Sequence, residues 1–203
     1  EKNDEAIWFA NDKTIKFSVD KKFISDRVKR KKTLDYFVPK ILGHSDNFYC
    51  YKFIEGKVFS EVVTAKKFEY LLSWLDRFWV EKKLNKTEKH NFKTNCKKFY
   101  KDKTIQRVND KRLPTLDSLL SKVDWNNISD GKPVRYHGDL HFENILMNET
   151  IDGLPFSLLD WRQNFNGQYE YGDIYYDFAK LYHGLIISHD FINQNFYNYT
   201  REM

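Results

Sequence analysis

The chain has 203 residues, a formal net charge of +5, and 41% hydrophobic and 17% aromatic residues, so it can bury a core and is not a disordered polyelectrolyte. No apolar run reaches the ~18 residues that a membrane span needs, and the first residues lack the basic-then-apolar order of a signal peptide. The two cysteines follow no CxxC spacing, which argues against a disulfide framework or a cysteine zinc site. We therefore expect a cytoplasmic protein without membrane insertion.

The first part of the chain has the pattern of a small α+β unit. Residues 5–20 alternate apolar and polar around a turn at Asn11–Lys13, which predicts a β-hairpin with the apolar side chains Ile15, Phe17 and Val19 on one face. A helix is expected over 21–35, an extended segment over 38–43, and a strand over 48–54.

From Ser60 the apolar period becomes helical, which predicts an amphipathic helix to Trp79 with Ser60 as its N-cap. Further helices are expected over 88–101, after Pro114 with Thr115 as N-cap, from Asp173 onward, and within 190–203. Strands are expected over 134–136, 145–147 and 156–159. The composition changes near 56–60, so we place a domain boundary between 1–56 and 57–203.

Much of the positive charge lies in 21–32, a segment with seven lysines and arginines. Such a cluster is most often a solvated helix face, which is the interpretation we favour. Nucleic-acid binding is an alternative, although no nucleic-acid motif accompanies the cluster. A third option is that it attracts a small polyanion such as a nucleotide.

One polar segment, His137 to Asn144, lies between two apolar strands, and the strand 156–159 ends directly before Asp160. Loops on a rigid scaffold are common places for catalytic groups. Asp139, Asn144 and Asp160 would bring together oxygen ligands of the kind that Mg²⁺ prefers. The pattern therefore indicates a site for a metal-assisted reaction.

The order HxDxxxxN, then a strand ending in Asp, resembles the aminoglycoside phosphotransferase and choline kinase family. Segment 172–179 resembles the helix that supports the family's catalytic loop, and 38–42 and 51–56 resemble its approach to the hinge. The resemblance covers about 14–187. It implies an α+β, bilobal protein-kinase-like fold, with a small β-rich N-lobe over 1–56 and a larger, mainly helical C-lobe over 57–203.

The family's chemistry implies an ATP- and Mg²⁺-dependent transfer of a phosphoryl group to a hydroxyl of a small metabolite, a sugar or an amino alcohol such as choline. Asp139 is then the catalytic acid or base that takes or orients the hydroxyl proton, and His137 is a catalytic-loop residue that buttresses it. Asn144 and Asp160 would hold Mg²⁺.

Further roles follow from the same resemblance. Lys16 would contact the α- and β-phosphates, with an ordinary strand lysine as the alternative interpretation. The backbone at Lys52 and Ile54 would bind adenine. Asp173 would accept hydrogen bonds from the catalytic loop.

The sequence departs from the family in its first lobe. No glutamate occurs between Glu5 and Glu55, so Asp26 is expected to take the place of the helix acid that pairs with the strand lysine. No glycine precedes Gly43, so a complete phosphate-covering hairpin does not fit before Lys16. We therefore expect a partly truncated N-lobe, and fusion to or association with another catalytic domain, such as one of surface-polysaccharide synthesis, remains open.

The acceptor is less defined by the sequence. Four candidates for contacting it lie near the expected catalytic residues: His141, Trp161, Arg162 and Tyr175. Aromatic side chains could hold a quaternary ammonium or a sugar, whereas core packing is the alternative for most of them. Arg162 could bind a phosphate or an acidic substrate, or pair with Glu170 on the surface. Two other functions stay open, a kinase-like binding domain with weak or no catalysis and a basic nucleic-acid-binding module.

Overall fold

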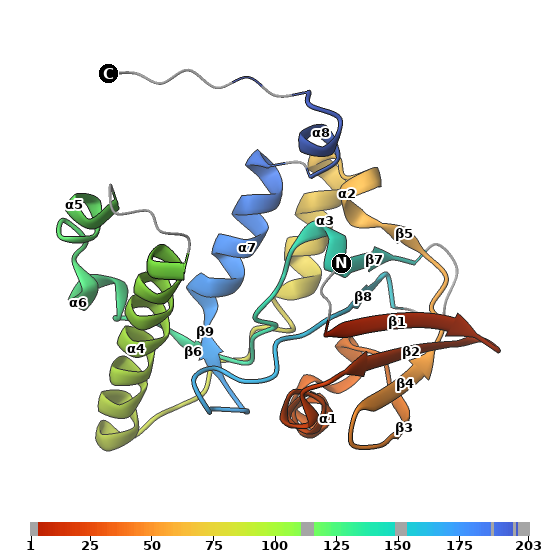
Figure 1. The fold of residues 1–203 in the computed structure, drawn as a ribbon, viewed down its shortest axis with the longest axis horizontal. Coiled ribbons are helices and arrows are strands. Elements are labelled where there is room, and N and C mark those ends of the chain that lie inside the picture. The colour runs from red at the N-terminus through yellow and green to blue at the C-terminus, as the bar shows by residue number, and fades with distance from the viewer. Residues whose placement is uncertain (1–3, 111–115, 149–153, 188, 197, 199–203) are drawn as a thin grey trace.

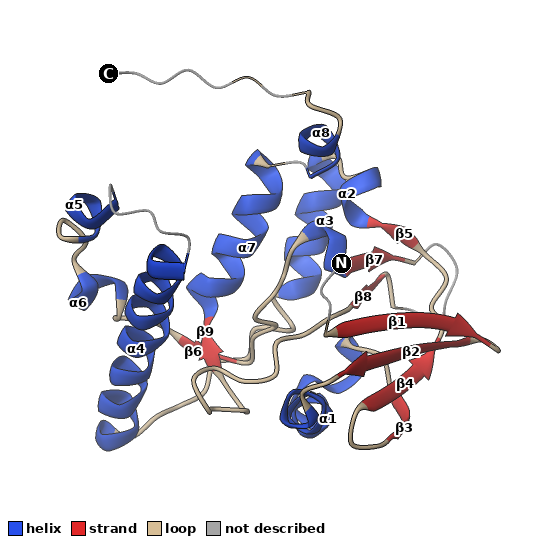
Figure 2. Ribbon diagram, in the orientation of Figure 1, coloured by secondary structure: helices blue, strands red, loops and turns tan. Residues whose placement is uncertain are grey.

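The computed structural model describes residues 4–110, 116–148, 154–187, 189–196 and 198. Figures 1 and 2 show a β-rich lobe beside a larger lobe made mainly of helices. The N-lobe comprises β1 (Glu5–Ala10), β2 (Lys13–Ser18), α1 (Lys21–Leu34), η1 (Asp35–Phe37), β3 (Ile41–His44) and β4 (Phe48–Lys52).

The N-lobe sheet is antiparallel with the strand order β1-β2-β4-β3. The β1–β2 turn consists of Asn11 and Asp12, whose φ angles are 49° and 57°. Two residues of positive φ match the twist of a tight hairpin, so the turn is shorter than the expected Asn11–Lys13. Among the described residues no strand precedes β1.

The buried face of β2 is its polar face. Thr14, Lys16 and Ser18 are buried, whereas Ile15 and Phe17 lie half-buried on the outer face. The cause is the position of β2 at the junction of the lobes, where its polar face meets charged groups of the C-lobe. The alternation predicted the hairpin, and the contacts between the lobes decide which face is buried.

The C-lobe is mainly helical, and no helix in its described parts is long and apolar enough to cross a bilayer. Its elements are β5 (Lys57–Val58), α2 (Phe59–Val62), α3 (Ala65–Leu75), α4 (Lys86–Asp110), α5 (Asp117–Leu120), α6 (Trp125–Ile128), β6 (Pro133–Val134), η3 (Phe142–Asn144), β7 (Ile145–Met147), β8 (Phe156–Leu158), β9 (Gly172–Asp173), α7 (Ile174–Ile186) and α8 (His189–Asn193). Two small sheets, β5-β7-β8 and β6-β9, frame the segment between β6 and β7.

The helix expected from Ser60 to Trp79 is interrupted. Val63 is extended, with φ −60° and ψ 134°, and Thr64 caps α3 by accepting a hydrogen bond from the N–H of Lys67. The prediction of Ser60 as the N-cap is therefore wrong. Pro114 and Thr115 lie outside the described residues, and α8 covers only part of the helix expected in 190–203.

A single hydrophobic cluster extends through both lobes. It joins Ile24 and Tyr49 of the N-lobe to Trp74, Phe142 and Leu158 of the C-lobe. A second cluster packs α4 against the chain before and after the catalytic segment. The division at residue 56 stays a prediction.

Arg30 of α1 connects the lobes by polar contacts. Its side chain is 1% exposed, and its guanidinium donates to the carbonyls of Tyr136, His137, Arg162 and Tyr169. A planar fork of donors suits several acceptors at once, which a lysine ammonium does not. Segment 21–32 is thus not a uniformly solvated face.

Replacing Arg30 with Met should lower the free energy of unfolding by about 3 kcal/mol or more, because buried carbonyls lose a charged donor. Arg30→Lys should be destabilised as well, because a lysine ammonium cannot reach all of these carbonyls at once. Lys32→Met, an exposed position on the same helix, should stay within about 0.5 kcal/mol of the unchanged protein. Urea denaturation measures all three, and equal midpoints for Arg30→Met and Lys32→Met would contradict the role of Arg30.

Candidate active site

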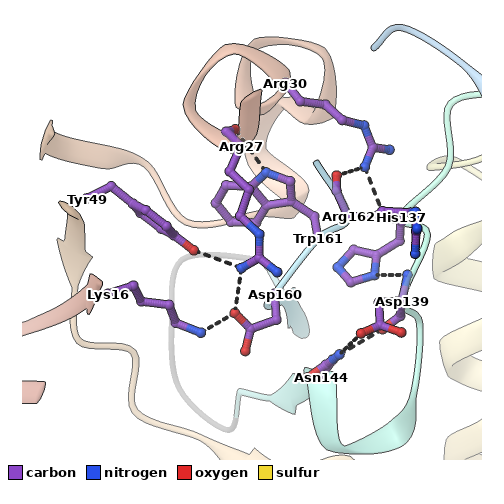
Figure 3. Close-up of polar contacts among 10 residues, drawn as sticks. All are labelled: Lys16, Arg27, Arg30, Tyr49, His137, Asp139, Asn144, Asp160, Trp161 and Arg162. Carbon is purple, nitrogen blue, oxygen red and sulfur yellow. Dashed lines mark hydrogen bonds and ion pairs between the residues drawn. The ribbon is translucent and has the colours of Figure 1, made fainter. Parts of the chain in front are cut away.

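A cleft of about 680 Å³ lies between the lobes, and its wall brings together most of the residues expected to act in catalysis. Charged and polar side chains from both lobes line it, including Lys16, Arg27, Tyr49, Asp139, Asn144 and Asp160. Figure 3 shows Lys16 of β2 and Arg27 of α1 pointing toward Asp160 from the N-lobe side. The alternative of Lys16 as an ordinary exposed lysine is excluded, since it is 8% exposed.

Asp160 is the electrostatic centre of this cleft. One of its carboxylate oxygens contacts Lys16 Nζ and lies 3.1 Å from Arg27 Nη1, which also donates to the Tyr49 hydroxyl at 3.1 Å. Burial alone would raise the pKa of Asp160, but the two cations outweigh it and hold that pKa below its ordinary value. Asp160 therefore stays ionised between Lys16 and Arg27.

The backbone at Asp160 is in the left-handed region, with φ 56°. This conformation costs a non-glycine residue on the order of 1 kcal/mol and is typical of functional positions. The preceding N–H of Leu159 donates to the carbonyl of Asn144 at 2.8 Å, which places Asp160 beside the catalytic loop.

The catalytic loop, residues 137–144, is fixed from two sides. Asp177 of α7 accepts the N–H groups of His137 and Gly138, each at 2.7 Å, while Arg30 holds the carbonyls of Tyr136 and His137. Gly138 has φ +87°, and a Cβ there would lie 2.6 Å from Arg162 Cβ, so a side chain does not fit. The backbone at the start of the loop is therefore held by α1 on one side and by α7 on the other.

These contacts correct two expectations about supporting acids. We expected Asp173 to accept hydrogen bonds from the loop, but Asp177 accepts them instead. Asp173 accepts hydrogen bonds from the Tyr100 hydroxyl and from the N–H groups of Lys132 and Tyr175. Asp26 does not replace the missing glutamate opposite Lys16. Its carboxylate instead accepts from Lys22, Asn164 and Tyr169, because it lies on the side of α1 that faces the C-lobe loop.

His137 is fully buried behind the loop. Burial, with help from Arg30, lowers the pKa of its imidazole to about 3, so the ring is neutral. Its Nδ1 accepts the N–H of Asp139 at 3.3 Å. A neutral ring with this contact supports the loop, and it is a poor candidate for proton transfer.

Asp139 has two basic neighbours from the C-lobe. His141 Nε2 lies 3.1 Å and Lys180 Nζ 2.9 Å from the same carboxylate oxygen, and the two nitrogens are 3.0 Å apart. Burial would raise the pKa of Asp139, but the hydrogen bond from His141 and the charge of Lys180 outweigh it and lower that pKa well below its usual range. The carboxylate is therefore ionised and able to accept a hydrogen bond.

The structure places the other candidates for contacting the acceptor in different surroundings. Trp161 is 1% exposed and donates to the carbonyl of Arg27, so it belongs to the core and is not an acceptor contact. Arg162 lies over the rings of Phe99 and Tyr176, while Glu170 pairs with Lys82 instead. Tyr175 is exposed on α7 and packs near Phe178, and the tyrosine next to Arg162 is Tyr176.

The residues expected to contact adenine lie at the junction of the lobes. Lys52 ends β4 and pairs with Lys13 in the sheet, and Ile54 follows in the segment leading to β5. Between them, the N–H of Phe53 donates to the carbonyl of Asp12 at 2.7 Å. Their role toward a nucleotide stays a prediction.

The donor set suits a hard cation that keeps other ligands. Asn144 Nδ2 donates to the carbonyl of Asp139 at 2.8 Å, which leaves its amide oxygen for the cleft beside the Asp160 carboxylate. Within the described ranges no group of three or more His, Cys, Asp or Glu residues could form a metal cage. Mg²⁺ typically binds through one or two protein oxygens plus water and phosphate, so these residues fit it.

Sequence analysis missed Arg27, Arg30 and Lys180. The signal for the two arginines was their position on α1, because they share a helical stripe with buried Ile24 and Leu34. For Lys180 no such signal exists, since its contact with Asp139 joins segments 41 residues apart.

The hydrogen bonds of Asp177 give a pH-dependent prediction. Burial raises the pKa of Asp177 from 3.8 to about 6, so between these values the folded protein keeps a proton that the unfolded chain releases. Its stabilising contribution is greatest below pH 3.8 and is lost as the pH rises through 6. The stability advantage of the unchanged protein over Asp177→Asn should therefore be about 1–3 kcal/mol at pH 4 and decline toward pH 7.

Urea titrations at several pH values measure this difference, and Asp102→Asn, at an exposed position of α4, is the control. If the free energy of unfolding of the unchanged protein, relative to that of Asp177→Asn, instead increases from pH 4 to pH 7, the proposed ionisation is contradicted.

Known proteins resemble this chain in sequence family and in fold. The model of the phosphotransferase enzyme family (APH) matches residues 64–196. Among solved structures, a GDP complex of an aminoglycoside 2′-phosphotransferase is 16% identical with a TM-score of 0.52, covering 91% of this chain and 70% of the other. A streptomycin–ATP ternary complex of APH(2″)-IIa is 18% identical with a TM-score of 0.50, covering 88% and 67%.

An ethanolamine kinase of Plasmodium vivax is 16% identical with a TM-score of 0.50, covering 91% of this chain and 62% of the kinase. No curated protein gave a significant match. The structural likeness confirms the expected bilobal, kinase-like fold, and the family match extends over well over half of the residues. The chain belongs to the phosphotransferase enzyme family.

Proposed function

We propose that the protein transfers the terminal phosphoryl group of a nucleoside triphosphate, with Mg²⁺, to a hydroxyl of a small metabolite. The observation that carries the proposal is the convergence of Lys16, Asp139, Asn144 and Asp160 on one cleft between the lobes. Phosphoryl transfer needs charge neutralisation and positioning more than covalent chemistry, and these four side chains supply both.

The nucleotide is expected to bind with its phosphates toward Lys16 and Arg27. Both cations are nearly buried and line the cleft beside Asp160, so a nucleotide phosphate bound there would meet two positively charged donors. Two of the structurally similar phosphotransferases are complexes with GDP and with ATP, which supports a nucleotide here. The backbone near Lys52 and Ile54 would then receive the base.

Asn144 and Asp160 would hold the metal. When bound, Mg²⁺ would neutralise charge on the nucleotide phosphates. A carboxylate at Asp160 whose pKa is already depressed is ionised over the physiological range and needs no proton release to bind a cation.

Asp139 would accept the proton of the acceptor hydroxyl. The hydroxyl oxygen forms a bond to the terminal phosphorus, the bond from that phosphorus to the leaving nucleoside diphosphate breaks, and the proton passes to the Asp139 carboxylate. Lys180 and His141 fix the orientation of that carboxylate. His137 acts as a positioning residue.

Two other functions have less support. A nucleic-acid-binding module would use the basic residues of α1, but its two arginines are engaged elsewhere, since Arg30 is buried and Arg27 lines the cleft. A non-catalytic binding domain would have no need for an ionised Asp139 held between two basic neighbours.

Asp139→Asn should retain nucleotide binding and lower the turnover number by about 100-fold or more, because a proton acceptor in the transition state typically contributes that much. Coupled ADP-release assays with Mg²⁺ measure turnover on a panel of hydroxylated acceptors, and thermal shift measures nucleotide binding. Asp102→Asn is the matched control. Full turnover in Asp139→Asn would contradict the role of Asp139. If the unchanged protein binds nucleotide but turns over no acceptor, the result would favour a non-catalytic binding domain.

Arg27→Gln should raise the KM for the nucleotide about tenfold or more, since a charged hydrogen bond contributes roughly 1.5–3 kcal/mol. The exposed position Lys32 on the same helix provides the control Lys32→Gln. An unchanged KM in Arg27→Gln would show that this arginine serves only the Asp160 contact.

A further inference from the structure

Three cationic side chains gather beside Asp139 on the C-lobe side of the catalytic loop: Lys103 of α4, Arg162 after β8, and Lys180 of α7. We propose that this cluster binds an anionic group of the acceptor, so that the substrate is a small hydroxylated metabolite carrying a carboxylate or a phosphate. The inference rests on the proposed function and names the acceptor class for that site.

The cluster is arranged around a single tyrosine ring. Lys103 Nζ, Lys180 Nζ and Arg162 Cζ lie 5.3, 5.7 and 5.9 Å from the centroid of Tyr176. Lys103 Nζ also lies 3.1 Å from the Tyr176 hydroxyl. Three elements distant in sequence therefore bring their cations to one place.

The positive charge of the cluster is not balanced by nearby acids. Lys180 pairs with Asp139, whereas neither Lys103 nor Arg162 forms an ion pair with a carboxylate in the part of the chain that the structure describes. Arg162 Nε is buried and has no hydrogen-bond partner there. A bound anion would give Lys103 and Arg162 a negatively charged partner.

The state of Lys103 shows the same imbalance. Burial, together with Arg162, Arg107 and Lys180, lowers the pKa of its ammonium to about 7, and Asp139 only partly opposes this. A bound anion would favour the charged form. Perturbed groups with identifiable charged neighbours are typical of binding sites.

The cluster is also correctly placed for an acceptor. Lys180 contacts both Asp139 and His141, so an anion held at Lys103 and Arg162 lies close to the carboxylate that takes the hydroxyl proton. Figure 1 shows α4 and α7 away from the β1–β4 sheet, whose strand β2 supplies the phosphate-facing Lys16. The acceptor and the nucleotide would thus approach Asp139 from different lobes.

The same charges disfavour an amine-bearing acceptor. A quaternary ammonium held by aromatic faces would meet Tyr176 where three cations already surround it. Like charges at such distances repel. An amino alcohol is therefore a weaker candidate than a hydroxy acid or a sugar acid or phosphate.

Matched acceptors test the proposal directly. Two series of acceptors differ mainly in charge. The first is glucose, glucosamine, glucuronate and glucose 1-phosphate, and the second is glycerol, serinol, glycerate and glycerol 3-phosphate. With MgATP, kcat/KM should be at least tenfold higher for an anionic member than for its neutral and amine partners, and the two anionic arms separate carboxylate from phosphate. Preference for a neutral or amine member would overturn the inference while leaving the proposed phosphotransferase function intact.

Variants locate the effect. Lys103→Gln and Arg162→Gln should each raise the KM for the preferred anionic acceptor about tenfold or more, with less than a twofold change in the KM for nucleotide. Lys98→Gln, at an exposed position of the same helix α4, should leave both values unchanged. Equal acceptor KM values for Lys103→Gln and Lys98→Gln would overturn the assignment.

A third measurement does not depend on finding the acceptor. Trace labelling with an amine-selective reagent at pH 7, with MgADP present at saturation, should modify Lys103 faster than Lys98. Millimolar inorganic phosphate should slow labelling of Lys103 at least threefold and leave Lys98 unaffected. Absence of this protection would overturn the anion site, whereas failure of all nucleotide binding and ADP release would overturn the proposed function instead.

Discussion

The site depends above all on the buried guanidinium of Arg30. It binds carbonyl groups that flank both the catalytic loop and the segment after Asp160, so one side chain of α1 fixes two parts of the C-lobe. Asp177 completes the arrangement by accepting N–H groups of the same loop from the other side. The backbone at His137 is thus held by Arg30 and Asp177 together, and these contacts position the segments that carry Asp139 and Asp160.

Charge is distributed unevenly around the two functional carboxylates. Asp160 pairs with Lys16 and Arg27, and Asp139 pairs with Lys180 and lies within hydrogen-bond distance of His141, so each acid is held in its ionised form. In phosphoryl transfer the reacting groups are anionic, and preorganised cations offset their repulsion. The same principle explains why the lysines and arginines of this basic chain matter mainly where they are buried.

The sequence was sufficient for the fold class, the first hairpin, most helices and the positions of Asp139, Asn144 and Asp160, because motif spacing and apolar periodicity are local. It was insufficient where contacts join distant segments. Asp173 and Asp177 lie one helical turn apart, and only packing of α7 decides which one meets the loop. Likewise, Asp26 looked like the partner of Lys16, but the orientation of α1 directs Arg27 to the cleft and Asp26 away from it.

The central claim is that the cleft between the lobes binds a nucleotide in a productive orientation. A crystal structure with Mg²⁺ and a non-hydrolysable ATP analogue tests it most directly. The account predicts phosphate oxygens at Lys16 and Arg27, the metal at Asn144 and Asp160, and the terminal phosphate facing Asp139. A nucleotide bound elsewhere, or phosphates turned away from Lys16 and Asp160, would contradict it.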